Sequence, residues 1–416
     1  MSSPTPLRAR RREWAAVAAA MFGVGWGANQ FAPMLLAYHS HLGLTVGTDQ
    51  ALFGIYALGL IPALLLGGPA SDRWGRSRLV RPAAVLSGAA TVLLIIGARS
   101  TLDLYGARLL AGVASGTVFA AGTAWVKELS MAPFDATSSE QSGARRAAIA
   151  LSAGFGLGPV AAGLIAQWSP DPLVLAYLPH LAVMLFVLPG LWRAPETVLV
   201  AGSASGGAGV LSRLRVPRAG RRQFFGVVVP MAPWVFGAPA VAFVVLPLMI
   251  RAHVAGFSIA FAGLAAGLTL GVGVAVQPLG RRLDTATGSR GAKVGLGAVA
   301  LGMLVASLAT LSQNLALVLL AVATLGAGYG LTLVAGLIEV QQIAGPGELA
   351  GLTAVYYALT YIGFALPLIL AELSLLARYT FLLLILAAAA AFTLLVIWSQ
   401  SGHGPGPGGA PVPTSK

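Results

Sequence analysis

The stretch VGLGAVALGMLVASLATLSQNLALVLLAVATLGAGYGLTLVAGLI, from Val294 to Ile338, contains no Asp, Glu, Lys or Arg over its 45 residues. As a single α-helix it would be about 67 Å long, more than twice the roughly 30 Å hydrocarbon core of a bilayer. The stretch must therefore fold back on itself, and Ser312, Gln313 and Asn314 form the expected turn. The sequence predicts two membrane-spanning helices here, joined by a very short loop.

Apolar segments of similar length occur along the whole chain. A helix that crosses the hydrocarbon core needs about 20 mostly apolar residues. Twelve segments meet this requirement, six on each side of a break near residue 200: Trp14–Tyr38, Gln50–Ala70, Pro82–Ala98, Leu104–Val126, Ala147–Trp168, Pro172–Trp192, Phe224–Ile250, Val254–Gly280, Val294–Leu311, Leu315–Gln342, Leu349–Ala371 and Tyr379–Trp398. We therefore expect an all-α integral membrane protein of twelve transmembrane helices in two six-helix halves.

The composition agrees with a membrane protein. Only 9% of the residues are charged, whereas soluble domains carry roughly 25%. The net charge of +13 would suggest a nucleic-acid partner in a soluble protein, but the basic residues stand in short clusters between apolar runs. Cysteine is absent, and no phosphate-binding loop or converging catalytic cluster is found. We expect no enzyme activity, no cofactor, no metal and no nucleic-acid partner.

The basic clusters also predict the orientation. Of the 26 Lys and Arg residues, 22 fall in segments on one side of the predicted spans, three fall on the other side, and Arg108 lies within a span. Positive loops stay in the cytoplasm, so both termini are expected there. The expected division is a cytoplasmic arm (1–13), a first half (14–198), a cytoplasmic linker (199–222), a second half (223–398) and a disordered tail (399–416). The high ratio of Arg to Lys and the abundance of Ala and Gly suggest a GC-rich bacterial genome, and we expect the protein in the bacterial inner membrane.

The segment GPASDRWGRSR lies between the second and third spans. A carboxylate beside three guanidinium groups at the membrane surface can form bidentate ion pairs, and the glycines permit tight turns. The general excess of Lys and Arg in cytoplasmic loops would explain the arginines, but it would not explain the spacing of glycine and aspartate. The segment closely resembles the signature loop of the major facilitator superfamily, which implies a conformational latch made by Gly68, Asp72, Arg73, Gly75, Arg76 and Arg78.

A weaker copy of this loop lies in the second half. Gly280 and Asp284 repeat the spacing of the first copy 212 positions later, and Arg290 follows them. Glu128 and Glu339 are separated by 211 residues. Two pairs at nearly one offset indicate internal duplication, as in transporters built from two related halves. The resemblance implies that Asp72 and its arginines meet Glu128 and the start of helix 11. Alternatively, Glu128 and Glu339 are interfacial carboxylates that balance Lys127 or Arg281.

The fifth span contains Gly154, Gly158, Pro159 and Gly163. Glycines at four-residue spacing permit close helix packing, which is common in membranes. The order Gly-x-x-x-Gly-Pro-x-x-small-Gly resembles the helix-5 motif of drug and metabolite:proton antiporters in the superfamily. This resemblance favours export over uptake. The Pro195-Glu196-Thr197 sequence after the sixth span also resembles the family.

Several polar and aromatic residues lie within the spans. In the superfamily, helices 1, 4, 7 and 10 line the central pathway, which nominates Trp26, Asn29, Gln30, Arg108, Trp234 and Tyr329 for substrate binding. The amides could instead form hydrogen bonds between helices, and Arg108 could extend to the membrane surface. Tyr356, Tyr357 and Tyr361 are weaker candidates, because aromatic side chains commonly serve packing.

Proton coupling needs a carboxylate, and the first span has none, unlike many proton-coupled drug exporters of the superfamily. Glu339 is the first candidate and Asp49 the second. The resulting hypothesis is a monomeric secondary transporter that exports small amphipathic or cationic compounds in exchange for protons. A metabolite uptake symporter or facilitator of the same fold is the alternative. A membrane receptor or scaffold without transport is the alternative of another class.

Overall fold

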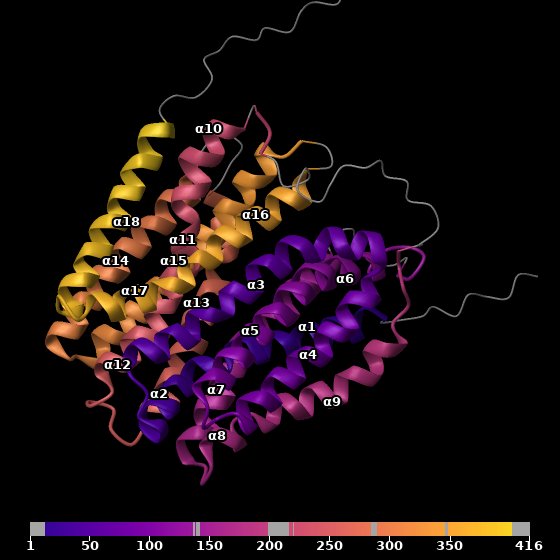
Figure 1. Ribbon diagram of the computed structural model, residues 1–416. Coiled ribbons are helices and arrows are strands. Elements are labelled where there is room, and N and C mark those ends of the chain that lie inside the picture. The colour runs from indigo at the N-terminus through magenta and orange to yellow at the C-terminus, as the bar shows by residue number, and fades with distance from the viewer. Residues whose placement is uncertain are drawn as a thin grey trace, which may run out of the picture.

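The computed structural model describes residues 13–135, 138, 142–198, 216–218, 220–283, 289–345 and 348–401. Within these ranges the chain forms helices and short connections, and it contains no β-strand. Figure 1 shows two bundles, the first in indigo and magenta and the second in orange and yellow. Most of the predicted arm, most of the linker and most of the tail lie outside the described residues.

The first bundle contains spans one to six. Its helices are α1 (Glu13–Asn29), α2 (Phe31–Leu42), α3 (Val46–Trp74), α4 (Arg76–Ile96), α5 (Thr101–Thr117), the π-helical turn η1 (Val118–Gly122), α6 (Thr123–Leu129), α7 (Ser142–Trp168), α8 (Pro172–Leu175) and α9 (Leu178–Arg193). The fourth span is the continuous run of α5, η1 and α6, and the sixth span is the run of α8 and α9.

The second bundle contains spans seven to twelve. Its helices are α10 (Arg221–Gln223), η3 (Phe224–Val228), α11 (Val229–Ala240), η4 (Val241–Val245), α12 (Leu246–Ile250), α13 (Ser258–Leu283), α14 (Arg290–Ser312), α15 (Leu315–Ile343), α16 (Leu349–Tyr361), the 3₁₀ turn η5 (Ile362–Ala365), α17 (Leu366–Leu373) and α18 (Tyr379–Ser401). The run from α10 to α12 forms span seven, and the run from α16 to α17 forms span eleven.

Eleven helices in the described chain are long and apolar enough to cross a membrane. The first span is divided at Gln30 into α1, of 17 residues, and α2, of 12 residues. Pro33 has no N–H to bond the carbonyl of Asn29 four residues earlier, which explains an interruption at this point. The divided first span and the eleven continuous spans together make the predicted arrangement, and the predicted fold class is confirmed.

The short turn at residues 312–314 is confirmed as well. The helix α14 ends at Ser312, Gln313 adopts a left-handed conformation, and α15 begins at Leu315. Asn314 caps α15, because its side-chain oxygen accepts hydrogen bonds from the N–H groups of Ala316 and Leu317.

Several helices begin or end four or more residues from the predicted boundaries, and two of these differences have a clear physical cause. The third span begins at Arg76 instead of Pro82, because a carboxylate from another loop caps the polar first turn of α4, as described below. The eighth span begins at Ser258 instead of Val254, because the chain still turns through Gly256, which has a φ of +76°.

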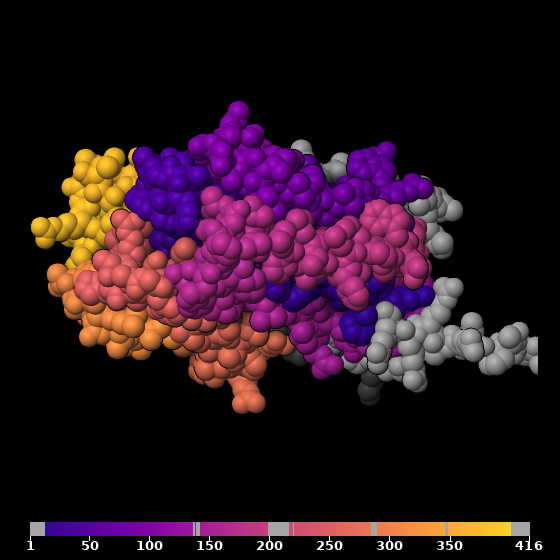
Figure 2. All heavy atoms as spheres, turned by 90° about the horizontal axis from the view of Figure 1, so that it is seen from below, coloured from indigo at the N-terminus to yellow at the C-terminus, as the bar shows by residue number. Residues whose placement is uncertain are grey.

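We call the end of the bundles at which α9 finishes and α10 starts the linker end, and the opposite end, at which α2, α8 and α12 lie, the distal end. In Figure 1 the bundles lie together toward the distal end and diverge toward the linker end. The principal packing between them joins α7 and α2 to α13, and α3 to α16 and α17. The space-filling view shows spheres of the first bundle bordering directly on those of the second (Figure 2).

The closest approach of the bundles uses two glycines. A Cβ atom added at Gly163 of α7 would lie 3.0 Å from the Cα of Gly263 in α13 and 2.9 Å from the carbonyl oxygen of Ile259. A Cβ atom at Gly263 would lie 2.5 Å from the carbonyl oxygen of Pro159. The backbones of the two bundles therefore touch, and only glycine fits between them.

The surface of the bundles suits a bilayer. Trp74, Trp192 and Trp398 are exposed near the linker end, where amphipathic rings anchor proteins in the headgroup region. The ammonium group of Lys293 lies 5.4 Å from the ring centroid of Trp398. Basic and aromatic side chains thus occur together at one end of the apolar surface.

Candidate functional site

A buried arginine joins three helices at the linker end. The guanidinium of Arg76, whose residue is 8% exposed, lies 2.6 Å from Asp72 Oδ1. It also donates to Glu128 Oε1 at 2.8 Å through Nη2 and at 3.2 Å through Nε. Thr197 donates a hydrogen bond to the other oxygen of Glu128. The loop between α3 and α4 is thereby tied to α6 and to the segment after α9.

Glu196 caps α4 from outside the helix. Its Oε1 accepts from the backbone N–H of Arg76 at 2.9 Å, and its Oε2 accepts from the N–H and hydroxyl of Ser77 at 2.9 and 2.6 Å. Gly75, with a φ of +104°, leaves room for this carboxylate, since a Cβ there would lie 2.7 Å from Glu196 Oε2. Burial opposes ionisation of Glu196, but these hydrogen bonds outweigh it and lower its pKa.

Replacing Glu196 with alanine is expected to destabilise the protein by about 1 kcal/mol at neutral pH, the usual cost of losing a helix cap. Because folding lowers the pKa of Glu196, its carboxylate stabilises the folded protein fully at any pH above its unfolded-state pKa. This stabilisation is lost as the pH falls through the pKa of Glu196 in the folded state. The difference in thermal unfolding between wild type and Glu196→Ala should therefore shrink below roughly pH 4.3.

Asp171→Ala is the control for this prediction, because Asp171 is exposed and makes no side-chain cap bond to α8. Equal unfolding temperatures for wild type and Glu196→Ala at neutral pH would contradict the capping role.

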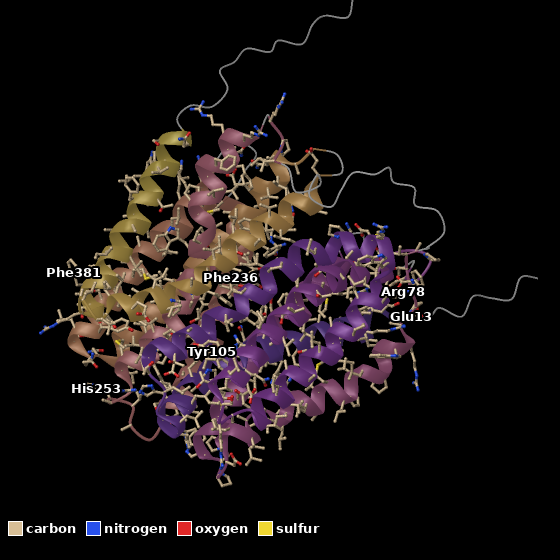
Figure 3. The ribbon with its side chains drawn as sticks, viewed as in Figure 1. Glu13, Arg78, Tyr105, Phe236, His253 and Phe381 are labelled. Atoms are coloured by element: carbon tan, nitrogen blue, oxygen red, sulfur yellow. The ribbon has the colours of Figure 1, made fainter. Side chains whose placement is uncertain are left out.

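The remaining residues of the first loop lie differently. Arg73 and Arg78 are exposed, and a Cβ at Gly68 would meet open space. Arg81, which no sequence motif marks, donates to the carbonyls of Trp192 and Ala194, both at 2.9 Å, and so caps the end of α9. Figure 3 shows Arg78 at the linker end.

The second copy of the loop is less fully described. Gly280 packs against Leu331 and Val334 of α15, and Arg290 is exposed at the start of α14. Asp284 lies outside the described residues. Glu339 is buried within the second bundle and accepts a hydrogen bond from Gln223 Nε2.

A pocket between the two bundles, which we call the central pocket, combines aromatic walls with one amide. The first bundle contributes Asn29, Tyr56 and Phe155. The second bundle contributes Phe236, Pro239, Phe243, Leu270, Tyr361 and Phe364. The enclosed space is only about 10 Å³, enough for about one water, so the pocket is a closed and mostly apolar contact between the bundles, with no carboxylate among its lining residues.

Aromatic contacts join the walls of the central pocket. Phe236 stacks on Tyr361 with ring centroids 4.5 Å apart and lies 5.7 Å from the ring of Tyr329. Phe364 approaches Phe53 of the first bundle at 4.9 Å. Figure 3 shows Phe236 between the bundles, far from the labelled residues at either end. Tyr361, a weak candidate from the sequence, thus lines the pocket directly.

The structure brings only some nominated substrate residues to this pocket. Asn29 lines it, and its Nδ2 lies 3.4 Å from the carbonyl oxygen of Phe155. Gln30 is fully buried inside the first bundle, where its Nε2 donates to Thr91 at 3.2 Å. Trp234 points to α18, because its Nε1 donates to Thr393 at 3.2 Å. Gln30 and Trp234 therefore bind other helices of their own bundles instead of lining the pocket.

Arg108 lies behind the pocket, buried in the first bundle with 1% exposure. Its Nε donates to the carbonyl of Leu52 at 3.2 Å, and its Nη1 donates to that of Ala28 at 3.3 Å. The guanidinium carbon lies 4.4 Å from the ring centroid of Phe31 and 4.7 Å from that of Tyr56. The side chain does not extend to the membrane surface. Within the described ranges it forms no ion pair with a carboxylate.

Asp49 lies in a second pocket between the bundles, toward the distal end. This distal pocket is lined by Asp49 and Gln50 of α3, by residues of α2, and by Phe243 and neighbouring apolar residues of the second bundle. Asp49 Oδ2 lies 2.9 Å from His39 Nδ1. Phe243 lines both pockets, so the distal and central pockets adjoin.

The comparisons with known proteins agree with this geometry. A sequence model described as the Major Facilitator Superfamily matches residues 15–368. The chain belongs to the major facilitator superfamily. No curated protein matches the sequence.

Solved structures show the same fold. A POT family transporter in complex with 5-aminolevulinic acid has a TM-score of 0.78 at 13% identity, with 94% of this chain and 96% of that chain covered. A mutant of the nucleoside transporter NupG has a TM-score of 0.74 at 10% identity, covering 94% and 100%. A mutant of the peptide transporter POT in complex with sulfate has a TM-score of 0.76 at 15% identity, covering 94% of each chain. Family and fold indicate a transporter rather than an enzyme.

In this superfamily member the helix-5 motif packs on both bundles. Cβ atoms at Gly154 and Gly158 would lie 2.2 Å and 2.7 Å from the carbonyl oxygens of Phe22 and Trp26 in α1. Pro159 and Gly163 instead meet α13 of the other bundle. The motif holds α1 against α7 and also forms the contact between the halves.

Proposed function

We propose that this chain is a secondary active transporter that exports small amphipathic compounds by alternating access, in exchange for protons. The observation that carries the proposal is the central pocket, whose walls come from both bundles. A movement of one bundle relative to the other would open this pocket to one side of the membrane and then to the other. Transporters built from two related halves work by such alternating access. The distal packing of α7 on α13 would be the contact that breaks when the distal side opens.

The linker end is assigned to the cytoplasm. Arg73, Arg76, Arg78 and Arg81 lie at this end, as do the basic starts of α7, α10 and α14. The distal loops between described helices carry Arg99, Arg251 and Arg378. Loops rich in Lys and Arg remain in the cytoplasm, so we assign both termini to the cytoplasm of a bacterial cell. The protein would act as a monomer in the inner membrane.

The pocket favours an amphipathic substrate over a cationic one. Aromatic side chains supply large apolar area, and Asn29 supplies a polar contact. The buried cation of Arg108 contacts Tyr56, which lines the pocket, and would oppose a second positive charge there.

The linker-end ion pairs have the proposed role of a latch. Asp72, Arg76 and Glu128 connect α3, α4 and α6, so these helices would move as one unit when the bundles rock. Gly280, Asp284 and Arg290 are the corresponding candidates in the second half. Of the coupling candidates, Glu339 lies within the second bundle, whereas Asp49 faces the other bundle.

Export is preferred because the helix-5 motif resembles that of the antiporters. Uptake is the second candidate, because the structural neighbours include transporters of peptides and nucleosides and one in complex with 5-aminolevulinic acid. A receptor or scaffold role would require that substrates are not moved at all.

The test uses membrane vesicles of known orientation and a panel of neutral, anionic and cationic fluorescent dyes. Right-side-out vesicles loaded with a transported dye are expected to lose it faster when the external medium is acidic, and a protonophore should abolish the difference. Accumulation of the dye from an acidic medium would instead establish uptake. Protein-free vesicles give the leak rate, and rates equal to this leak for every dye would reject transport of the tested compounds.

A further inference from the structure

The distal pocket places two polar side chains at a closed contact between the bundles. Asp49 and Gln50, each 2% exposed, line it together from α3. The second bundle closes the pocket with apolar side chains only: Phe243, Val244, Pro247, Leu248 and Ala262. A carboxylate thus lies where the two halves of the transporter meet.

One oxygen of each polar side chain has no hydrogen-bond donor among the described residues. Asp49 Oδ2 contacts His39 Nδ1, but Asp49 Oδ1 is buried without a partner. Gln50 Oε1 is also buried without a partner. Buried polar atoms normally form hydrogen bonds, and an orphaned buried atom destabilises the closed structure. A water in the pocket or a proton on the carboxylate itself would supply the donor that these two acceptors lack.

A metal ion fits these acceptors poorly. Calcium takes about 6–8 oxygen ligands, and magnesium demands an octahedral set of about six. The pocket supplies two orphaned oxygens, and its remaining lining is apolar. A proton needs only one oxygen to bind and converts that oxygen into a donor.

Few charged groups surround Asp49. His39 of α2 faces it directly, Arg251 after α12 acts on it from the second bundle, and Tyr105 of α5 lies within electrostatic range. Glu372 of α17 lies close to α3 at Gly47, because a Cβ atom added to Gly47 would lie 3.0 Å from Glu372 Oε1. The lining residues from η4, α12 and α13 carry no charge. Closing the distal contact over an ionised Asp49 therefore costs more free energy than closing it over a neutral one.

We propose that the distal pocket is the binding site of the transported proton, and that the distal end closes only after Asp49 Oδ1 has taken a proton from the external medium. The proton makes Oδ1 a donor for the acceptors in the pocket. It leaves toward the central pocket, which adjoins the distal pocket at Phe243, when the linker end is open. This inference rests on the proposed proton-driven transport and assigns its coupling residue to Asp49.

The experiment exploits the absence of cysteine from the chain. Ala262→Cys places a thiol on α13 in the distal pocket, where Ala262 is 1% exposed. Ala252→Cys places one on the exposed loop after α12 and corrects for the ionisation of the thiol itself. Both are labelled with a membrane-impermeant maleimide outside right-side-out vesicles, in sodium-free buffers between pH 5 and pH 9.

The ratio of labelling rates at the two positions is expected to fall with decreasing pH, by up to about tenfold per pH unit across the titration of one group. In Asp49→Asn, whose side chain is neutral at every pH, the ratio should stay low throughout. If the ratio of labelling rates does not change with pH in the protein that retains Asp49, the proposal is overturned, even if Asp49→Asn fails to fold. A pH-dependent ratio in a folded Asp49→Asn overturns it too.

Sodium provides the competing outcome. Sodium chloride at pH 9 should leave the ratio unchanged relative to choline chloride, and a fall caused by sodium alone would assign the pocket to that ion instead. The labelling needs no substrate, so it separates this inference from the proposed function. Proton-linked closure without dye export would reject export only, and export with a pH-independent ratio would reject the role of Asp49 only.

Discussion

Replacing Gly163 with valine is expected to abolish transport and to hold the distal end open. A Cβ at this position would lie 2.9 Å from the carbonyl oxygen of Ile259 and 3.0 Å from the Cα of Gly263, and both atoms belong to the backbone of the opposite bundle. Backbone atoms cannot rotate away as a flexible side chain can, so α7 and α13 must separate. Overpacking of this kind costs about 1–3 kcal/mol, which shifts a two-state equilibrium by roughly 5- to 150-fold.

Gly156→Val is the matched control, because Gly156 lies on the same helix within the same motif and a Cβ there meets nothing within 4 Å. Dye efflux should stay near the wild-type rate in Gly156→Val and should fall to the leak rate in Gly163→Val. The cysteine at position 262 should be labelled rapidly at every pH in the Gly163→Val background. Normal efflux by Gly163→Val would show that the glycine contact is not needed for alternation.

Much of the fold could be predicted because a bilayer limits what a chain can do. Backbone groups in hydrocarbon must form hydrogen bonds internally, so a long apolar run has to be a helix. The run from Val294 to Ile338 was too long for one crossing, and its three polar residues marked the turn that the structure shows at Gln313 and Asn314.

The direction of individual side chains was harder to predict. Hydropathy locates a span along the chain, but it does not tell which side of a helix faces the pocket when both neighbours and lipid are apolar. Asn29 and Gln30 are adjacent in sequence, yet Asn29 lines the central pocket and Gln30 bonds to Thr91 within the first bundle. Trp234 was nominated by its helix, but its N–H reaches Thr393 of α18.

The linker-end site was partly predictable. The resemblance implied that Asp72 and Glu128 belong together, and in the structure Arg76 connects them. The capping of α4 by Glu196 depends on a contact between residues about 120 positions apart, and only the Pro195-Glu196-Thr197 sequence marked this place. Arg81 gave no signal beyond the general excess of positive charge.

Replacing Arg108 with methionine is expected to slow transport at least about tenfold while leaving thermal stability unchanged or raised. Burying a guanidinium is expensive, and even a buried ion pair can often be replaced by apolar side chains of similar volume at no cost or with a gain of about 1–4 kcal/mol. Arg108 makes no carboxylate ion pair in the described chain, and its hydrogen bonds go to backbone carbonyls of Ala28 and Leu52. Arg108 is thus a buried cation that costs folding free energy, has no ionic partner among the described residues and lies next to the wall of the central pocket. Such a residue fits a role in transport better than a role in folding.

Arg99→Met is the control, because Arg99 is an exposed cation in a distal loop of the same bundle. Unfolding temperature in detergent and dye efflux in vesicles should be measured on both variants. Arg99→Met should keep both properties, whereas Arg108→Met should keep stability and lose at least about tenfold in efflux rate, the loss that 1.4 kcal/mol produces. A large fall in unfolding temperature for Arg108→Met would assign the residue to the fold, because its charge would then stabilise the junction of α1, α2 and α3. Efflux at the wild-type rate would remove Arg108 from the mechanism, and the aromatic walls would remain as the main determinant of substrate binding.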